Sequence, residues 1–126
     1  MTVNPLDGFS VAPEDIQFIG DGLQRPECIL AERDGTLWSA DARGGVVRIA
    51  PDGTQQLIAA TEQAKFSEAD GEEARFTQGT LPNGLAFAEN GDILIANYGT
   101  DLLEQMSRSG ETVPLHDNID GKPMGK

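Results

Sequence analysis

Apolar residues fall into short runs separated by turn residues, a pattern that predicts strands rather than helices. One group of runs covers 28–32, 36–40, 46–50 and 54–59, and a second covers 85–88, 92–97, 102–107 and 111–115. Between runs stand the pairs Asp34-Gly35, Asp52-Gly53, Asn90-Gly91 and Ser109-Gly110. Because glycine, asparagine and aspartate tolerate the positive φ of tight hairpins, we expect consecutive strands to pair antiparallel.

The two groups of strands are two copies of one repeat. A shift of 56 residues (82 − 26) aligns Pro26 with Pro82, Glu27 with Asn83, Gly35 with Gly91, Ala40 with Ala96 and Asp41 with Asn97. After one inserted residue the shift becomes 57, which aligns Gly53 with Gly110. Each copy is therefore predicted to form a four-stranded antiparallel meander, which is the blade of a β-propeller.

The repeat divides the chain into five parts. They are an N-terminal segment at 1–24, blade 1 at 25–60, an acidic inter-blade loop at 61–80, blade 2 at 81–115 and a Gly/Pro-rich linker at 116–126 toward a third blade. The apolar residues of 15–20 are consistent with one more, outer strand, and 62–66 with a short helical turn.

Chain length sets how much of a propeller this sequence encodes. At ~40–45 residues a blade and at least ~4 blades, a closed ring needs on the order of 160 residues. The chain has 126 residues. We therefore expect an all-β protein with about two blades, an incomplete propeller.

The charge balance and the N-terminus exclude several function classes. Nine basic and 21 acidic residues give a formal charge of −12, which disfavours nucleic-acid and membrane-surface binding. No apolar run approaches the ~18 residues of a membrane span, and the first ten residues lack a signal-peptide pattern. We expect a cytoplasmic protein.

Single copies of cysteine and histidine limit the chemistry further. Cys28 has no partner for an internal disulfide, and a single histidine, His116, excludes paired-histidine metal sites and most serine–histidine or cysteine–histidine relays within the chain. We expect Cys28 to be a small core residue and Trp38 to pack between the blades. At the ends of the second strands, Asp41 and Asn97 are expected to cap the turns that follow.

Residues 25–41 and 81–99 resemble the SMP-30/gluconolactonase/LRE-like family of six-bladed propellers. The shared pattern is an acidic or amide residue beside a proline, an apolar strand, Asp/Asn-Gly, and then Leu-Trp-Ser-Ala-Asp or Ile-Leu-Ile-Ala-Asn. The second unit with its lead-in, DGEEARF followed by PNGLA, is also similar to the NHL repeat. Both resemblances imply blades.

The first resemblance implies a divalent cation, calcium or zinc, held at the channel mouth by oxygen ligands from several blades. Glu27 matches the first-blade glutamate ligand, although Cys28-Ile29 follows it where the family has Gly-Pro. Asn83 stands in a Pro-Asn-Gly motif like those that supply asparagine ligands, which in the family fall in later blades. The catalytic residue is unknown, because the later asparagine and catalytic aspartate positions have no counterpart here.

Structural roles compete with these metal-binding roles. Glu27 is also typical of an exposed residue that flanks a strand, and Asn83 of a turn residue beside Gly84. The acidic run at 68–73 lacks the ligand spacing of an EF-hand and is expected to be a solvated loop.

Three hypotheses remain open. The first is part of a propeller whose complete form is a divalent-cation-dependent hydrolase of small lactones or related esters, with this chain alone inactive. The second is a non-catalytic, NHL-like propeller module that binds a partner or small molecule. The third is a blade pair that completes its ring by self-association through exposed blades.

Overall fold

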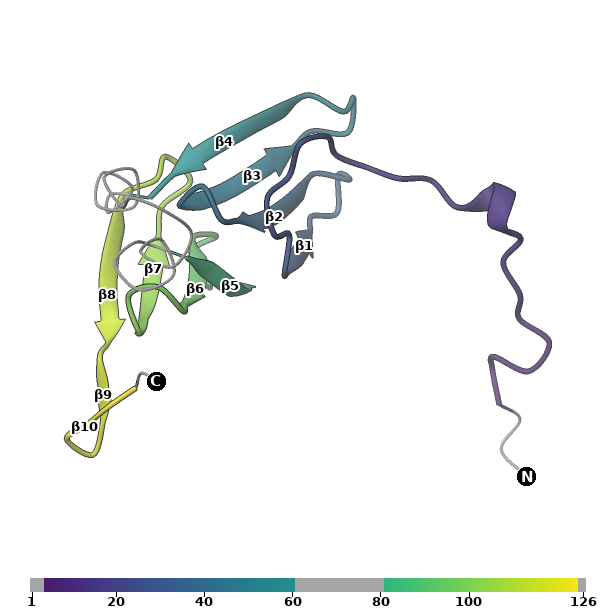
Figure 1. The fold of residues 1–126 in the computed structure, drawn as a ribbon. Helices are drawn as coiled ribbons and strands as arrows, with labels where there is room; N and C mark the ends of the chain where they lie inside the picture. Colours follow the sequence, from purple (N-terminus) through teal and green to yellow (C-terminus); the bar gives the residue numbers. More distant parts are fainter. Residues whose placement is uncertain (1–3, 61–80, 125–126) are drawn as a thin grey trace.

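The protein forms two four-stranded antiparallel sheets, each built from consecutive strands (Figure 1). The structure is a computed structural model that describes residues 4–60 and 81–124. The first sheet contains β1 (Ile29–Ala31), β2 (Leu37–Asp41), β3 (Gly45–Ile49) and β4 (Gln55–Ala59). The second contains β5 (Pro82–Phe87), β6 (Ile93–Asn97), β7 (Leu102–Met106) and β8 (Thr112–His116). The all-β class and the two meanders are confirmed.

Short polar side chains close the hairpin turns. Asp34 accepts a hydrogen bond from the backbone N–H of Thr36 at 2.9 Å, and Asp52 accepts one from Thr54 at 2.9 Å. These backbone donors hold the pKa values of both carboxyls below their usual range. The glycines that follow have positive φ, Gly35 and Gly53 among them. The predicted turn chemistry is therefore present.

One hydrophobic core lies between the two sheets. The first sheet and the residue after it contribute Trp38, Ala40, Val46, Ile58 and Ala60, and the second contributes Leu85, Ile93, Ile95 and Met106. Trp38 is only 2% exposed. Cys28 packs against this core, and its Sγ–H donates to the Leu85 carbonyl at 3.7 Å. Trp38 therefore packs between the sheets as predicted, whereas Cys28 is partly buried at the margin of the core rather than within it.

The two sheets meet through opposite faces of the repeat. Trp38, Ala40 and Val46 bring the first sheet to the core. In the second repeat, the equivalent residues are Leu94 and Ala96 at a shift of 56 and Leu103 at a shift of 57. The strand pairing agrees, because Ala40 pairs with Val46 in the first sheet as Ala96 pairs with Leu103 in the second. Since side chains alternate along a strand, these equivalents lie on the face of the second sheet opposite Ile93 and Ile95. The units therefore pack head to tail.

A cluster of polar and aromatic side chains joins the sheets at the turns. The Arg108 guanidinium lies 4.5 Å from the centroid of the Trp38 ring and 5.2 Å from that of Phe87. It also forms an ion pair with Glu32, which accepts a 2.6 Å hydrogen bond from Trp38 Nε1. The hydrogen bond from Arg108, and then that from Trp38, lowers the pKa of Glu32. This cluster fixes the approach of the two sheets.

The N-terminal segment differs from the sequence prediction. The outer strand expected at 15–20 is absent, and the described part instead has a short 3₁₀ turn, η1 (Pro13–Asp15), followed by chain without regular structure. Residues 4–19 extend away from both sheets (Figure 1), and Phe18 is 96% exposed. The chain reaches the first sheet only beyond them, where the Gln55 side chain exchanges two hydrogen bonds with the backbone of Asp21, so 15–20 have no strand edge to pair with.

The predicted C-terminal linker contains a small hairpin. Strands β9 (Asn118–Ile119) and β10 (Lys122–Pro123) pair around Asp120-Gly121, both with positive φ. Runs of two residues are too short for a hydrophobic pattern to reveal, which is why sequence analysis assigns a linker. The inter-blade loop at 61–80 and its expected helical turn lie outside the described residues.

Some strand limits also shift. β5 begins at Pro82 rather than residue 85, because Pro82 still pairs with Asn97 beyond a bulge between Pro82 and Gly84. In the described residues, no helix is long and apolar enough to cross a bilayer.

Candidate functional site

The first strands of the two sheets run side by side in the same direction. Near the start of β1, Cys28 contacts Leu85 in β5. Beyond the end of β1, Glu32 pairs with Arg108, which also donates to the carbonyl of Gly91 beyond the end of β5. Both strands therefore begin at one edge of the molecule. This is the edge where Glu27 precedes β1 and where Asn83 is the second residue of β5.

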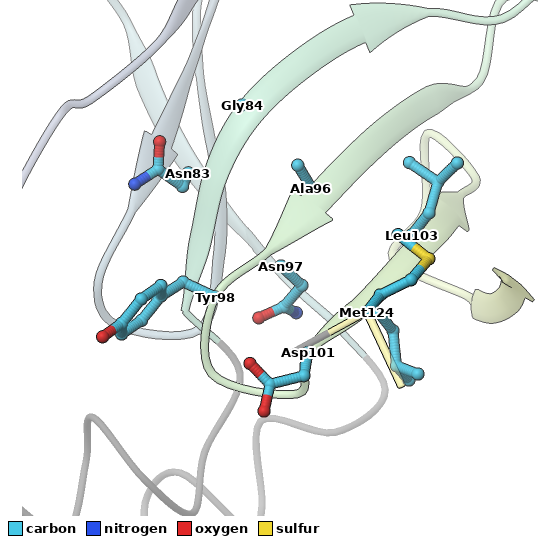
Figure 2. Close-up of a pocket in the computed structure, with 9 residues that line it drawn as sticks. Asn83, Gly84, Ala96, Asn97, Tyr98, Asp101, Leu103 and Met124 are labelled. Atoms are coloured by element: carbon cyan, nitrogen blue, oxygen red, sulfur yellow. The ribbon is translucent and has the colours of Figure 1, made fainter. Parts of the chain in front are cut away.

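A pocket of about 530 Å³ opens at this edge of the second sheet. Figure 2 shows its polar side, with Asn83 and Tyr98 on one flank and Asp101 near Asn97, and its apolar side at Leu103 and Met124. The lining residues are Asn83, Gly84, Ala96, Asn97, Tyr98, Asp101, Leu102, Leu103 and Met124. Asn83 is exposed, whereas Asn97 is buried. A carboxylate and two side-chain amides thus lie beside an apolar wall.

Buried Asn97 organises the polar side of this pocket. Its Oδ1 accepts the backbone N–H groups of Leu81 at 2.8 Å, Gly99 at 3.1 Å and Thr100 at 3.3 Å. Its Nδ2 donates to Glu104 at 2.8 Å, and Glu104 also accepts the Thr100 hydroxyl at 3.0 Å. Asn97 therefore fixes both the turn that carries Tyr98 and Asp101 and the chain that leads into Asn83.

Asp41 has the same role in the first sheet. It accepts the backbone N–H of Gln24 at 3.0 Å and that of Arg43 at 2.9 Å, and its carboxylate also pairs with the Arg43 guanidinium at 2.7 Å. Burial alone would raise the pKa of Asp41. The hydrogen bonds from Arg43 and Gln24 outweigh burial, so the pKa lies below its usual value.

The predicted capping by Asp41 and Asn97 is confirmed, but sequence analysis missed their second function. Each side chain also holds the chain that enters its own sheet, Gln24 in one repeat and Leu81 in the other. These contacts span 17 and 16 residues. The signal that could have revealed them is the recurrence of an Asx residue at one position of both repeats.

Glu27 lies at the same edge but outside the pocket. Its carboxylate forms a 2.7 Å ion pair with Arg25, and its side chain is 40% exposed. The Glu27 backbone N–H donates to the Arg25 carbonyl at 2.8 Å, which closes a three-residue turn around Pro26. The structure thus places Glu27 beside a strand, as the structural alternative expects. The metal roles of Glu27 and Asn83 remain predictions.

Backbone strain concentrates at this edge. Among the described residues, three non-glycine residues have positive φ, and two of them are Arg25 at 49° and Asp101 at 57°. Such conformations cost of order 1–3 kcal/mol and persist where the surrounding structure enforces them, often at functional sites. Here the Pro26 turn and the Asn97 network enforce them. The edge that carries Glu27 and Asn83 is therefore the best candidate for a functional surface.

No protein-family model, curated protein or solved structure matches the chain. Within residues 4–60 and 81–124, no three His, Cys, Asp or Glu side chains lie close enough together to hold a metal ion. Glu27, Asn83 and Asp101 offer the oxygen donors that hard cations prefer. Among the described residues, the structure does not bring Glu27 into the pocket that Asn83 and Asp101 line.

Proposed function

We propose that the two sheets are neighbouring blades of an SMP-30/gluconolactonase-like propeller. Its complete ring would hydrolyse lactones or related small esters with the help of a bound divalent cation, calcium or zinc. The observation that carries the proposal is the parallel start of β1 and β5 at one edge, with Glu27 and Asn83 at the two starts.

Head-to-tail packing supports the propeller. Because opposite faces of the repeat meet, the contact is heterologous, and it continues from unit to unit until a ring closes. In the second sheet, the face available for a further unit carries Leu94, Ala96 and Leu103, of which Ala96 is exposed. An apolar sheet face of this kind is suited to packing against another blade.

In the proposed reaction, Glu27 binds the cation and Asn83 serves as a ligand or a substrate contact. A divalent cation bound there would supply Lewis-acid activation of a lactone carbonyl and of water. The residue that would accept the proton is not assigned in this chain. Arg25 competes with the cation for Glu27, but a half-exposed ion pair contributes only about 0–1 kcal/mol, so a dication can displace it.

The test is hydrolysis of a panel of five- and six-membered lactones by the protein in a complete ring. We expect activity with calcium or zinc, loss on chelation and recovery when the cation is restored. Glu27→Gln should abolish activity. The matched control Glu14→Gln, at an exposed site in η1, should retain it. Full activity after chelation would refute the metal mechanism.

A non-catalytic, NHL-like binding module is the second candidate. It is favoured by the ion pair that already occupies the Glu27 carboxylate and by the absence of Glu27 from the pocket lining. If the protein is such a module, we expect a folded ring that hydrolyses no lactone and whose ligand binding is unaffected by Glu27→Gln.

The third hypothesis, a self-assembling blade pair, is tested by light scattering on the 126-residue chain. It predicts a defined oligomer rather than a monomer.

A further inference from the structure

A second pocket, of about 720 Å³, lies between the two sheets. Trp38, Arg48 and Gln56 are direct cross-strand neighbours on β2, β3 and β4, so they form one row across the first sheet. Arg108 and Ser109, in the turn after β7, line the other side. We call this the seam pocket; Leu57, Ile58 and Ala59 complete its lining.

The two arginines of the seam pocket differ in their surroundings. The Arg108 guanidinium is immobilised by Glu32, by the Gly91 carbonyl and by the Trp38 ring. Arg48 is half-buried and makes no hydrogen bond or ion pair with the described part of the chain. A guanidinium has five N–H donors in a fixed fork. From the wall of the seam pocket, Arg48 is therefore placed to donate to an oxyanion.

Two carboxylates act on Arg48 only through space. The pKa of Asp34 is lowered first by the Thr36 backbone N–H and to a smaller degree by the charge of Arg48, and Asp52 shows the same order with Thr54. Both aspartates are exposed and already accept hydrogen bonds within their own turns. They moderate the positive potential around Arg48 but leave its donors unoccupied.

We propose that the seam pocket binds a small oxyanion, the carboxylate or phosphate group of a small molecule, between Arg48 and Arg108. A guanidinium fork matches such groups with two parallel hydrogen bonds. The Gln56 amide and the Ser109 hydroxyl add donors, while Trp38 and Ile58 offer an apolar wall to the rest of the ligand. The volume admits a small molecule, and the net charge of −12 disfavours a polyanion.

This site is separate from the Asn83 pocket and independent of the proposed lactonase function. Trp38 lies near the turn between β1 and β2, whereas Asn83 lies at the edge where β5 begins. No residue lines both pockets. Success or failure of anion binding therefore leaves the metal proposal untouched.

Trp38 makes the test direct, because it is the only tryptophan and it lines the seam pocket. The full chain is titrated with sodium phosphate and, separately, sodium acetate, at ionic strength held constant with sodium chloride. We expect a saturable change in Trp38 fluorescence with at least one of them. Saturation with phosphate alone assigns a phosphate group, and saturation with acetate alone assigns a carboxylate.

Arg48→Gln should weaken binding about tenfold or more, because it removes charge-assisted hydrogen bonds. The matched control Arg33→Gln removes the same charge at an exposed turn and should bind like the wild type. Circular dichroism verifies folding. If Arg48→Gln does not fold, Arg48→Lys serves instead and should bind several-fold more weakly, because it keeps the charge but not the fork. Titrations that do not saturate, or that are equal in wild type and the Arg48 variant, overturn the proposal.

Discussion

Substituting Gly110 by alanine tests the contact between the two sheets. A Cβ on Gly110 would lie 2.3 Å from the carbonyl oxygen of Ala59, which is backbone of the other sheet. Gly110 also has a φ of +103°. The repeat supplies a matched control in Gly53, which has a φ of +86° and whose Cβ would meet nothing within 4 Å.

The two substitutions separate backbone strain from the contact. An L-residue at positive φ costs roughly 1–2 kcal/mol, so Gly53→Ala should lower the free energy of unfolding by about that amount. Gly110→Ala has a similar cost from positive φ. It also overpacks the new Cβ against a backbone atom, which typically costs a further ~1–3 kcal/mol. We therefore expect Gly110→Ala to be more destabilising by at least about 1 kcal/mol.

Urea unfolding followed by Trp38 fluorescence measures both variants, since Trp38 lies in the core between the sheets. Near-ultraviolet circular dichroism should also show a change in the Trp38 environment only for Gly110→Ala. Equal destabilisation by the two substitutions would refute the close approach of the β7–β8 turn to β4.

Two further predictions concern buried and interfacial polar groups. Because the pKa of Glu32 is depressed in the folded state, its pairing stabilises the protein above the unfolded-state value and is lost as the pH falls through the folded-state pKa. Arg108→Gln should therefore flatten the acid-side decline in unfolding free energy, and an unchanged pH profile would contradict this. Glu104→Ala removes the buried hydrogen bond from Asn97 Nδ2 to the Glu104 carboxylate and should cost about 1–3 kcal/mol in urea unfolding. Thr100→Val, which removes one hydroxyl donor to Glu104, should cost less than Glu104→Ala.

Local interactions explain why much of the fold could be predicted. The turns at Asp34 and Asp52 are closed by hydrogen bonds between residues two positions apart. Because both partners lie within a few consecutive residues, the local sequence is enough to predict these turns. Trp38, the only tryptophan, is in the core between the sheets as the sequence predicts. The strand expected at 15–20 fails for the opposite reason, because pairing depends on an edge that local sequence does not specify.

The site is less predictable because its contacts are distant in sequence. Glu32 and Arg108 are separated by 76 residues, and neither residue has a distinctive motif. Met124 reaches the Asn83 pocket from beyond a hairpin of two-residue strands, which no periodicity reveals. Glu27 and Asn83 are identified through a resemblance and a repeat. Their shared edge follows only from the parallel course of β1 and β5.

The most direct test of the proposed function is a calorimetric titration of calcium and zinc into the protein in a complete ring. We predict one cation site in the wild type, the same site in the Glu14→Gln control and no measurable site in Glu27→Gln. Equal cation affinity in wild type and Glu27→Gln would contradict the role of Glu27 as a ligand and, with it, the proposed metal-dependent lactonase.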